Sequence, residues 1–170
     1  MSDLGYPESA ILQQPNGAPA WPAGLCGSIA HSASHVAVAM ALTSQLRSVG
    51  IDIEDGRSLD GATNDVATAE EIDCLVAHPL AGNAERAARL VFSAKEAIYK
   101  CQAPLSGNAC LSFTEVRLEM AAGGGLKVYP TAPLGPSTTT IISEISVLFK
   151  IFQGLTLAIA WIYPMSSKSV

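Results

Sequence analysis

The sequence predicts an α+β fold in which antiparallel sheet packs against one long helix and one shorter helix. Alternating apolar residues, the period of a strand, occur both before residue 55 and after residue 112, whereas residues 67–101 repeat apolar residues every three to four positions, the period of a helix. Hydrophobic residues make up 49% of the 170 residues. That content is enough for one sizeable core, or two small lobes, without disulfides or metals.

Composition narrows the function classes. The net charge is -5 and Lys and Arg do not cluster, which argues against a nucleic-acid surface. Four cysteines without C-x-x-C spacing, and no recognisable signal peptide, predict reduced thiols in a cytoplasmic protein and disfavour a zinc site. Charged and polar residues interrupt the apolar stretch 141–163, so we expect buried strands there and no membrane span.

The first 26 residues hold four prolines and three glycines, which block long helices and central strands. We interpret residues 1–26 as a connecting segment and not as a domain. Trp21, before Pro22, is a candidate packing anchor for this segment.

Three strands are predicted next: Gly27–His31, His35–Leu42 and Ser48–Glu54. The connections between them have hairpin length, so we expect an antiparallel meander in which each strand pairs with the next. Facing residue numbers would then sum to about 66 in the first hairpin and about 89 in the second. This register brings His31 and His35 to the same sheet end as Glu54.

The third strand carries two acids at alternate positions. Asp52 and Glu54 share one face, and Ile51 and Ile53 share the other. Two carboxylates about 5 Å apart repel by about 3 kcal/mol at an effective dielectric constant of about 20. If partly buried, the pair needs a cation, a proton or a basic neighbour. The alternative interpretation is a strand end with solvated acids.

Two helices are expected in the middle of the chain, a short one over Ala67–Ala77 and the longest over Ala84–Cys101 with Asn83 as its N-cap. On the long helix, Glu96 and Lys100 lie along the edge of the apolar stripe. One interpretation is a surface ion pair worth about 0.3 to 0.5 kcal/mol. The other places both side chains in a cleft between layers.

The remaining segments are predicted as strands over 113–120, 126–129, 141–152 and 155–162, with a loop over 130–140. The Gly123–Gly125 triplet is interpreted as a hairpin turn, because no helix follows it as a phosphate-binding loop requires.

Histidine side chains are common metal ligands in proteins. His31 and His35 lie four residues apart, which brings two imidazoles together on a helix, but this segment alternates like a strand. We therefore favour His31 as a hydrogen-bond donor to a phosphate. We interpret His35 as a hairpin residue and His78 as a loop residue.

Three blocks stand in a fixed order along the chain: Trp21-Pro22 with Gly27–Ser32, then Gly50–Glu54, then Phe92–Lys100. Together they resemble the 4′-phosphopantetheinyl transferase superfamily, and more closely its enterobactin-synthetase component D and surfactin-activating branch. The segment from Pro104 to Phe113 also fits this family. The resemblance implies a transferase-like domain over residues 27–165, with 27–47 as the remnant of a reduced first lobe and 48–165 as the second lobe.

The resemblance also implies a division of roles among the site residues. The implied Mg²⁺ ligands are Asp52, Glu54 and Glu96. The groups implied to bind the phosphates of coenzyme A are His31, Lys95, Lys100 and the backbone of Ala30. Magnesium prefers oxygen ligands and retains waters and substrate phosphates, which agrees with a partial carboxylate shell.

The implied reaction transfers the phosphopantetheine arm of coenzyme A to a serine of an apo acyl or peptidyl carrier protein and releases adenosine 3′,5′-bisphosphate. Glu96 would take the serine proton, directly or through a metal-bound water, and Lys100 would stabilise negative oxygens in the transition state. The implied setting is siderophore or secondary-metabolite biosynthesis.

The sequence departs from this family in two places. Lys and Arg are absent before Arg47, where full-length members carry basic residues, and Ala30 replaces the usual serine. Three hypotheses follow: an active transferase, which completes its pocket between subunits as the shorter trimeric holo-acyl-carrier-protein synthases do; a truncated relative that binds Mg²⁺, coenzyme A or a carrier without catalysis; and a structural remnant or partner-dependent subunit. A reduced lobe would expose apolar surface and favour a homo-oligomer.

Overall fold

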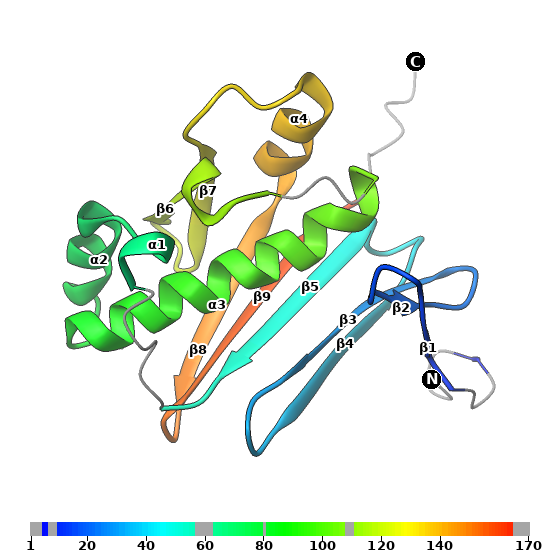
Figure 1. The fold of residues 1–170 in the computed structure, drawn as a ribbon, viewed down its shortest axis with the longest axis horizontal. Helices are drawn as coiled ribbons and strands as arrows, with labels where there is room; N and C mark the ends of the chain where they lie inside the picture. The colour runs from blue at the N-terminus through cyan, green and yellow to red at the C-terminus, as the bar shows by residue number, and fades with distance from the viewer. Residues whose placement is uncertain (1–4, 7–9, 57–62, 80, 108–110, 165–170) are drawn as a thin grey trace.

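The structure is a computed structural model of the chain and describes residues 5–6, 10–56, 63–79, 81–107 and 111–164. It confirms the α+β class. A five-stranded antiparallel sheet has the order β5-β9-β8-β7-β6, and the long helix α3 lies across one of its faces (Figure 1). In that order the strands span Ser48–Glu54, Leu155–Ile162, Ser146–Phe152, Leu126–Pro130 and Val116–Met120.

Both predicted helices are present with slightly different ends. The shorter, α2, spans Ala69–Val76 and begins at a capping box in which Thr68 and Glu71 each bond the other's backbone N–H. The longer, α3, spans Ala84–Gln102, and the side chain of Asn83 caps it by accepting from the Arg86 N–H at 2.9 Å. A single turn, α1 (Thr63–Val66), precedes α2, and η2 (Ala103–Leu105) continues α3.

The main core lies between α3 and the sheet. The apolar stripe of α3 is fully buried there: Leu90, Val91, Ala94, Ala97, Ile98 and Cys101. Alternate residues of β9, including Ala158, Ala160 and Ile162, meet this stripe from the sheet. This packing fixes α3 over β5 and β9, the two strands with which it shares most contacts.

The predicted meander is wrong at its second hairpin. Strands β3 (Leu25–His31) and β4 (Val36–Leu42) pair with each other, one residue from the expected register, and form a separate two-stranded sheet. After β4 the N–H groups of Gln45 and Leu46 bond the Leu42 carbonyl, a turn that carries the chain away from β4. Strand β5 then pairs with the distant β9.

The hairpin nevertheless stays beside β5. The Ile51 N–H donates to Ser28 Oγ at 3.1 Å, and the Ala33 N–H donates to Asp55 Oδ2 at 3.3 Å. Both contacts advance along the two strands in the same direction, so β3 runs parallel to β5, as Figure 1 also shows. The turn between β3 and β4 therefore lies next to the end of β5 that carries Glu54 and Asp55.

Besides the single turn α1, a longer helix near the end of the chain was not predicted. Residues 130–140 were expected as a loop and 141–152 as a strand, but α4 spans Pro136–Glu144 and β8 begins only at Ser146. Pro136 occupies the first turn, where the missing N–H is not needed. Ile141 and Ile142 are buried in the core. The run of Ser and Thr between them and Pro136 has weak helix propensity, which concealed the helix.

The ends of the expected β segments also shifted. Residues 113–115 form a 3₁₀ turn, η3 (Phe113–Glu115), before β6, and the glycine triplet closes the β6–β7 hairpin as predicted, with Ala121 N–H bonded to the Gly125 carbonyl at 3.1 Å. Among the residues described, no helix is long and apolar enough to cross a membrane.

The first segment has little regular structure, as expected. Up to Gly24, its described part contains only two-residue strands, β1 (Leu12–Gln13) and β2 (Pro19–Ala20); β3 begins at Leu25. The Trp21 ring lies against Gly27, where a Cβ atom would come within 2.5 Å of the ring. Trp21 thus anchors this segment to the β3–β4 hairpin, and Gly27 provides the space.

Candidate active site

Strand β5 presents its small and acidic residues to α3. Ser48 Oγ donates to the Cys101 carbonyl at 2.6 Å. Two residues on, a Cβ atom at Gly50 would collide with the Ala97 carbonyl and lie 2.6 Å from the Cys101 nitrogen. Only glycine therefore allows α3 to lie this close to β5. The next residues on that face are Asp52 and Glu54, so the close approach brings both acids to the helix.

The opposite face of β5 is apolar, as the alternation predicted. Ile51 and Ile53 are buried in a second, smaller cluster with Ala30, and Ala37 and Ala39 of β4 pack against it. The side chain of Ala30, expected near coenzyme A through its backbone, is 3% exposed and belongs to this cluster. Its methyl group has a packing role here.

Asp52, Lys100 and Glu96 meet between β5 and α3. Lys100 Nζ lies 2.6 Å from Asp52 Oδ1 and 3.9 Å from Glu96 Oε2. The exposed fractions of the three side chains are 7% for Asp52, 27% for Lys100 and 28% for Glu96. Of the two sequence interpretations, the structure supports the cleft between layers, because Lys100 binds the strand acid more closely than its helical neighbour.

This cluster carries more negative than positive charge. Asp52 Oδ2 is buried and, while Glu54 is ionised, has no hydrogen-bond donor among the residues that the structure describes. Burial raises the pKa of Glu54 to about 7, helped by the charges of Asp52 and Asp55 and by the hydrogen bond that the protonated carboxyl shares with Asp52; Lys100 opposes the shift. The strand end therefore calls for a further cation or a proton.

The pKa of Glu96 is also shifted. Burial raises the pKa of its carboxyl; the neighbouring Lys100 ammonium acts in the opposite direction, and the charge of Asp52 adds to the increase. A carboxylate with a raised pKa is a better proton acceptor than a solvated one.

The predicted magnesium ligands come from both elements: Asp52 and Glu54 from β5, and Glu96 from α3. No group of three or more His, Cys, Asp or Glu side chains has the geometry of a metal site within the described ranges. The donor chemistry nevertheless fits a hard divalent cation, because three carboxyl groups face a single ammonium and one carboxylate oxygen lacks a donor. The metal assignment of Asp52, Glu54 and Glu96 stays a prediction.

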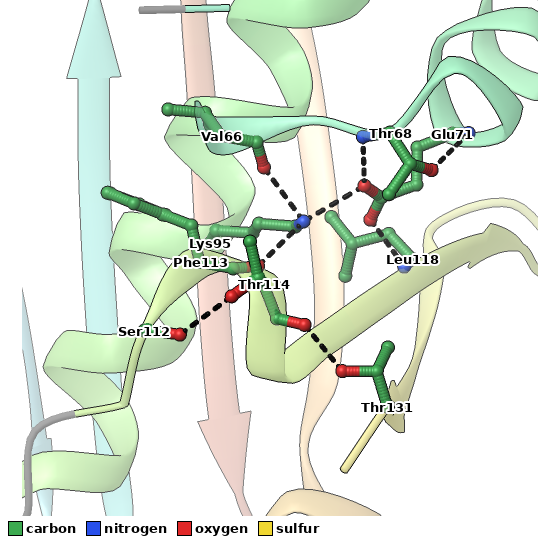
Figure 2. A network of polar contacts seen from close by, with 9 residues as sticks. All are labelled: Val66, Thr68, Glu71, Lys95, Ser112, Phe113, Thr114, Leu118 and Thr131. Atoms are coloured by element: carbon green, nitrogen blue, oxygen red, sulfur yellow. Dashed lines mark hydrogen bonds and ion pairs between the residues drawn. The ribbon is translucent and has the colours of Figure 1, made fainter. Parts of the chain in front are cut away.

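Lys95, predicted to bind coenzyme A phosphates, has its ammonium bonded to protein groups. Figure 2 shows its ammonium inside a network, where it donates to Glu71 Oε2, the Val66 carbonyl and the Phe113 carbonyl, each at 2.9 Å. The side chain is 2% exposed. All three N–H donors are used, so the structure does not support a phosphate contact. Burial lowers the pKa of Lys95, and Glu71 opposes that shift.

Glu71, the buried partner of Lys95, was not predicted from the sequence. One carboxylate oxygen accepts from Lys95 and from the Thr68 N–H, and the other accepts from the Leu118 N–H at 2.9 Å. In the sequence it belonged to acidic residues expected at a helix start. The Thr68-x-x-Glu71 capping box was a local signal, but it gave no indication of the distant lysine.

The histidines keep mainly local contacts. His31 is exposed at the end of β3, next to the turn whose Ala33 N–H reaches Asp55. The expected placement at the acidic sheet end is therefore supported, whereas its phosphate role stays a prediction. His35 Nδ1 bonds Ser34 Oγ at 2.8 Å within the hairpin, and the His78 ring packs edge-on against Phe149.

A pocket of about 290 Å³ opens beside Glu96. Its wall is mainly apolar and comes from α3, from the segment before β6 and from the start of β6. The lining residues are Lys95, Glu96, Tyr99, Leu111, Ser112, Phe113 and Val116. The Phe113 ring also contacts Phe92 of α3 at a centroid distance of 5.6 Å. A flexible, partly apolar ligand arm would fit a space of this kind next to the acid cluster.

Two family models match the chain. The model of the 4′-phosphopantetheinyl transferase superfamily matches residues 48–160, which contain β5, α3 and the five-stranded sheet except for the last two residues of β9. The model of the 4′-phosphopantetheinyl transferase N-terminal domain matches residues 1–41.

Curated relatives give the same result. The chain is 36% identical over 119 residues to 4′-phosphopantetheinyl transferase Npt of Nocardia iowensis, covering 69% of this chain and 52% of that protein. It is 36% identical over 128 residues to Svp of Streptomyces mobaraensis, covering 72% and 50%. For PptT of Mycobacterium tuberculosis the identity is 35% over 108 residues, covering 62% and 46%. The chain thus spans about half the length of these relatives.

Among solved structures, the holo-[acyl-carrier-protein] synthase (AcpS) from Neisseria meningitidis matches with a TM-score of 0.48 and 20% sequence identity. The match covers 70% of this chain and 99% of that chain.

Proposed function

The chain belongs to the 4′-phosphopantetheinyl transferase superfamily, and from that membership we propose that it transfers the 4′-phosphopantetheine arm of coenzyme A to a serine of an apo carrier protein. In this reaction the serine oxygen forms a bond to the phosphorus next to pantetheine, the pyrophosphate P–O bond breaks, and adenosine 3′,5′-bisphosphate leaves. The observation that carries the proposal is the meeting of Asp52, Lys100 and Glu96 from β5 and α3.

Asp52, Glu54 and Glu96 would hold Mg²⁺, as the donor set allows. When bound, the ion supplies electrophilic stabilisation of the pyrophosphate oxygens. The raised pKa of Glu54 supports this role, because a bound cation would offset the burial and the neighbouring negative charges that raise it.

Glu96 is proposed as the group that takes the serine proton. It lies at the boundary between the acid cluster and the 290 Å³ pocket, and burial has raised its pKa. A base in this position reaches both the pyrophosphate side and the pocket side of the site. The neutral carboxyl formed by proton transfer is the form that burial favours.

Lys100 and His31 are proposed to bind phosphate oxygens of coenzyme A. Lys100 carries a point charge on a flexible stem and is the ammonium group nearest the acids in the described structure. His31 is exposed beside the acidic end of β5. The pantetheine arm would lie in the pocket against Tyr99, Leu111 and Phe113.

The proposed branch of the family and the proposed carrier follow from the sequence resemblance. We place the chain in the enterobactin-synthetase and surfactin-activating branch, with a carrier protein of siderophore or secondary-metabolite biosynthesis as acceptor and the cytoplasm as location. The relatives' names support the transferase chemistry and leave the carrier to be identified by experiment.

The deciding experiment is mass spectrometry of an apo carrier protein incubated with the chain, coenzyme A and Mg²⁺. We expect the carrier mass to increase by one phosphopantetheine group, with equimolar release of adenosine 3′,5′-bisphosphate. Neither change should occur when Mg²⁺ is replaced by a chelator. An unmodified carrier in a panel of acyl and peptidyl carriers would contradict the proposal.

A second candidate is a relative that binds Mg²⁺, coenzyme A or the carrier without transferring the arm, or that acts with a partner. It is favoured by the small number of cations at the site: Lys95 is fully bonded to protein groups, and Lys100 is paired with Asp52. Calorimetry with coenzyme A and Mg²⁺ would detect binding, and the unchanged carrier mass would separate this candidate from the enzyme.

A further inference from the structure

We propose that the ammonium of Lys100 and a divalent cation compete for the carboxylate of Asp52, so that metal binding breaks the Lys100–Asp52 ion pair and frees Lys100 to bind phosphate. The inference rests on the proposed function, because it concerns the same acids. It assigns Lys100 a second role, that of an internal counterion which the metal must displace.

The first support is the position of the ammonium. Lys100 Nζ lies between a strand acid and a helix acid, at 2.6 Å from Asp52 Oδ1 and 3.9 Å from Glu96 Oε2. A cation liganded by both carboxylates, at metal–oxygen distances of about 2.1 Å, would have to lie within a few ångströms of this nitrogen. Two cations so close repel each other strongly in a partly buried site.

The second support is the state of Asp52. Its side chain is 7% exposed, and its Oδ2 atom is buried with no hydrogen-bond donor bonded to it among the described residues. One ammonium therefore satisfies only part of this carboxylate. A divalent cation carries twice the charge of the ammonium and can bind several oxygen ligands at once. It can therefore replace the ammonium and still neutralise the negative charge of the Asp52 carboxylate.

The third support is the exposure and flexibility of the Lys100 side chain, which allow it to move. It is in the last turn of α3, its side chain is 27% exposed, and its four-carbon stem is flexible. The fully bonded Lys95, five residues earlier on the same helix, has no such freedom at 2% exposure. Exchange is therefore a property of Lys100 and not of the helix lysines in general.

The exchange would order the binding events. The metal would first take Asp52 from Lys100, and the released ammonium would then be available to the pyrophosphate of coenzyme A. The prediction is that Lys100 weakens binding of the metal alone and strengthens binding of coenzyme A once the metal is present.

The test measures binding of Mn²⁺ alone, through loss of the electron paramagnetic resonance signal of the free ion. Mn²⁺ accepts the same oxygen ligands as Mg²⁺. We expect Lys100→Met to bind Mn²⁺ about tenfold more tightly than the unsubstituted chain, since a repelling charge has been removed. Lys127→Met, which removes an exposed positive charge on β7, should leave the affinity unchanged. Equal or weaker Mn²⁺ binding by Lys100→Met would overturn the exchange.

A second measurement uses the unsubstituted chain, so that it does not depend on folding of a variant. Lysines are acetylated briefly with and without Mg²⁺, and the modification of each residue is quantified by mass spectrometry. We expect Mg²⁺ to increase acetylation of Lys100 several-fold and to leave Lys127 unchanged. Unchanged or reduced acetylation of Lys100 at a Mg²⁺ concentration that supports transfer would overturn the exchange.

The outcomes separate this inference from the proposed function. Transfer to a carrier together with unchanged Lys100 acetylation would refute the exchange alone. Failure of Mn²⁺ to bind either form of the protein, together with no transfer, would refute the metal-dependent function and the exchange with it.

Discussion

Two lysines of α3, five residues apart, each bind an acid, but the surroundings of the two pairs differ. Lys95 and Glu71 are almost completely buried and every donor of Lys95 is used. Lys100 and Asp52 belong to a cluster with more carboxyl groups than ammonium groups, and one carboxylate oxygen has no donor within the described part of the chain. The comparison teaches that completeness of bonding, and not the presence of an ion pair, separates a structural pair from one available to a ligand.

The structural pair also supports the candidate site at a distance. Lys95 ties together three segments that are far apart in the sequence: the turn at Val66, the helix residue Glu71 and the carbonyl of Phe113 (Figure 2). Phe113 lines the pocket beside Glu96. The buried pair therefore holds one wall of the pocket against α3.

The largest expected effect comes from breaking the complete pair. Lys95→Met should lower the free energy of unfolding by about 3 to 5 kcal/mol, because it leaves Glu71 buried without its cation. Adding Glu71→Gln should recover part of this loss, since the amide oxygen can still accept from backbone N–H groups. Urea unfolding measures both changes, with Lys127→Met as the exposed control. A Lys95→Met protein of normal stability but weak coenzyme A binding would instead support the phosphate role.

Next in size is the effect of neutralising the incomplete cluster. Glu96→Gln should slow transfer by about 10² to 10⁴-fold, the usual range for loss of a general base, and Asp52→Ala should abolish transfer. Both proteins should remain folded by circular dichroism. Glu144→Gln is a matched control for Glu96→Gln, because the two glutamates have similar exposure, 33% and 28%. Normal turnover in either site variant would exclude these roles.

A smaller effect should follow from separating the two layers. Gly50→Ala adds a methyl group against the Ala97 carbonyl and should cost about 1 to 3 kcal/mol of stability while α3 shifts from β5. Transfer should decline because Glu96 and Lys100 move away from Asp52. Gly123→Ala, where a Cβ atom meets nothing within 4 Å, is the control and should change neither quantity. Thermal unfolding and initial rates check both variants.

The smallest effect concerns pH. The pKa of Glu54 is about 7 in the folded chain and 4.5 in the reference state, so the folded chain binds more protons between these values and stability declines as pH rises through them. Because Glu54 is only partly buried, solvent screening reduces the expected loss to about 1 kcal/mol between pH 5 and pH 8. Glu54→Gln should flatten this dependence in urea unfolding without added metal, whereas Glu144→Gln should leave it unchanged. A steeper decline in Glu54→Gln would contradict this cause.

Local patterns were enough to predict much of the fold. Alternation along β5 separated Asp52 and Glu54 from the isoleucines, and Asn83 marked the start of α3 at Ala84. These features depend on periods and caps that a short stretch contains. The α+β class followed from the same signals.

Long-range pairing was beyond local patterns. Both β4 and β9 alternate suitably, and only the complete fold selects β9 as the neighbour of β5. The bonding partners of Lys95 could not be predicted from the sequence either. Lys95 and Lys100 lie in the same short motif and differ only in which distant groups surround them. For the candidate site, the sequence suggested which residues to compare, and the structure separated the surroundings of Lys95 and Lys100.

The pairing of β5 with β9 has a consequence for synthesis of the chain on the ribosome. The strand with the acids is made early, but its hydrogen-bonding neighbour is Leu155–Ile162, so β5 waits through roughly a hundred intervening residues for its only sheet partner in the described structure. Nascent chains arrested before that point would expose an apolar strand without a partner, a state prone to aggregation and chaperone capture.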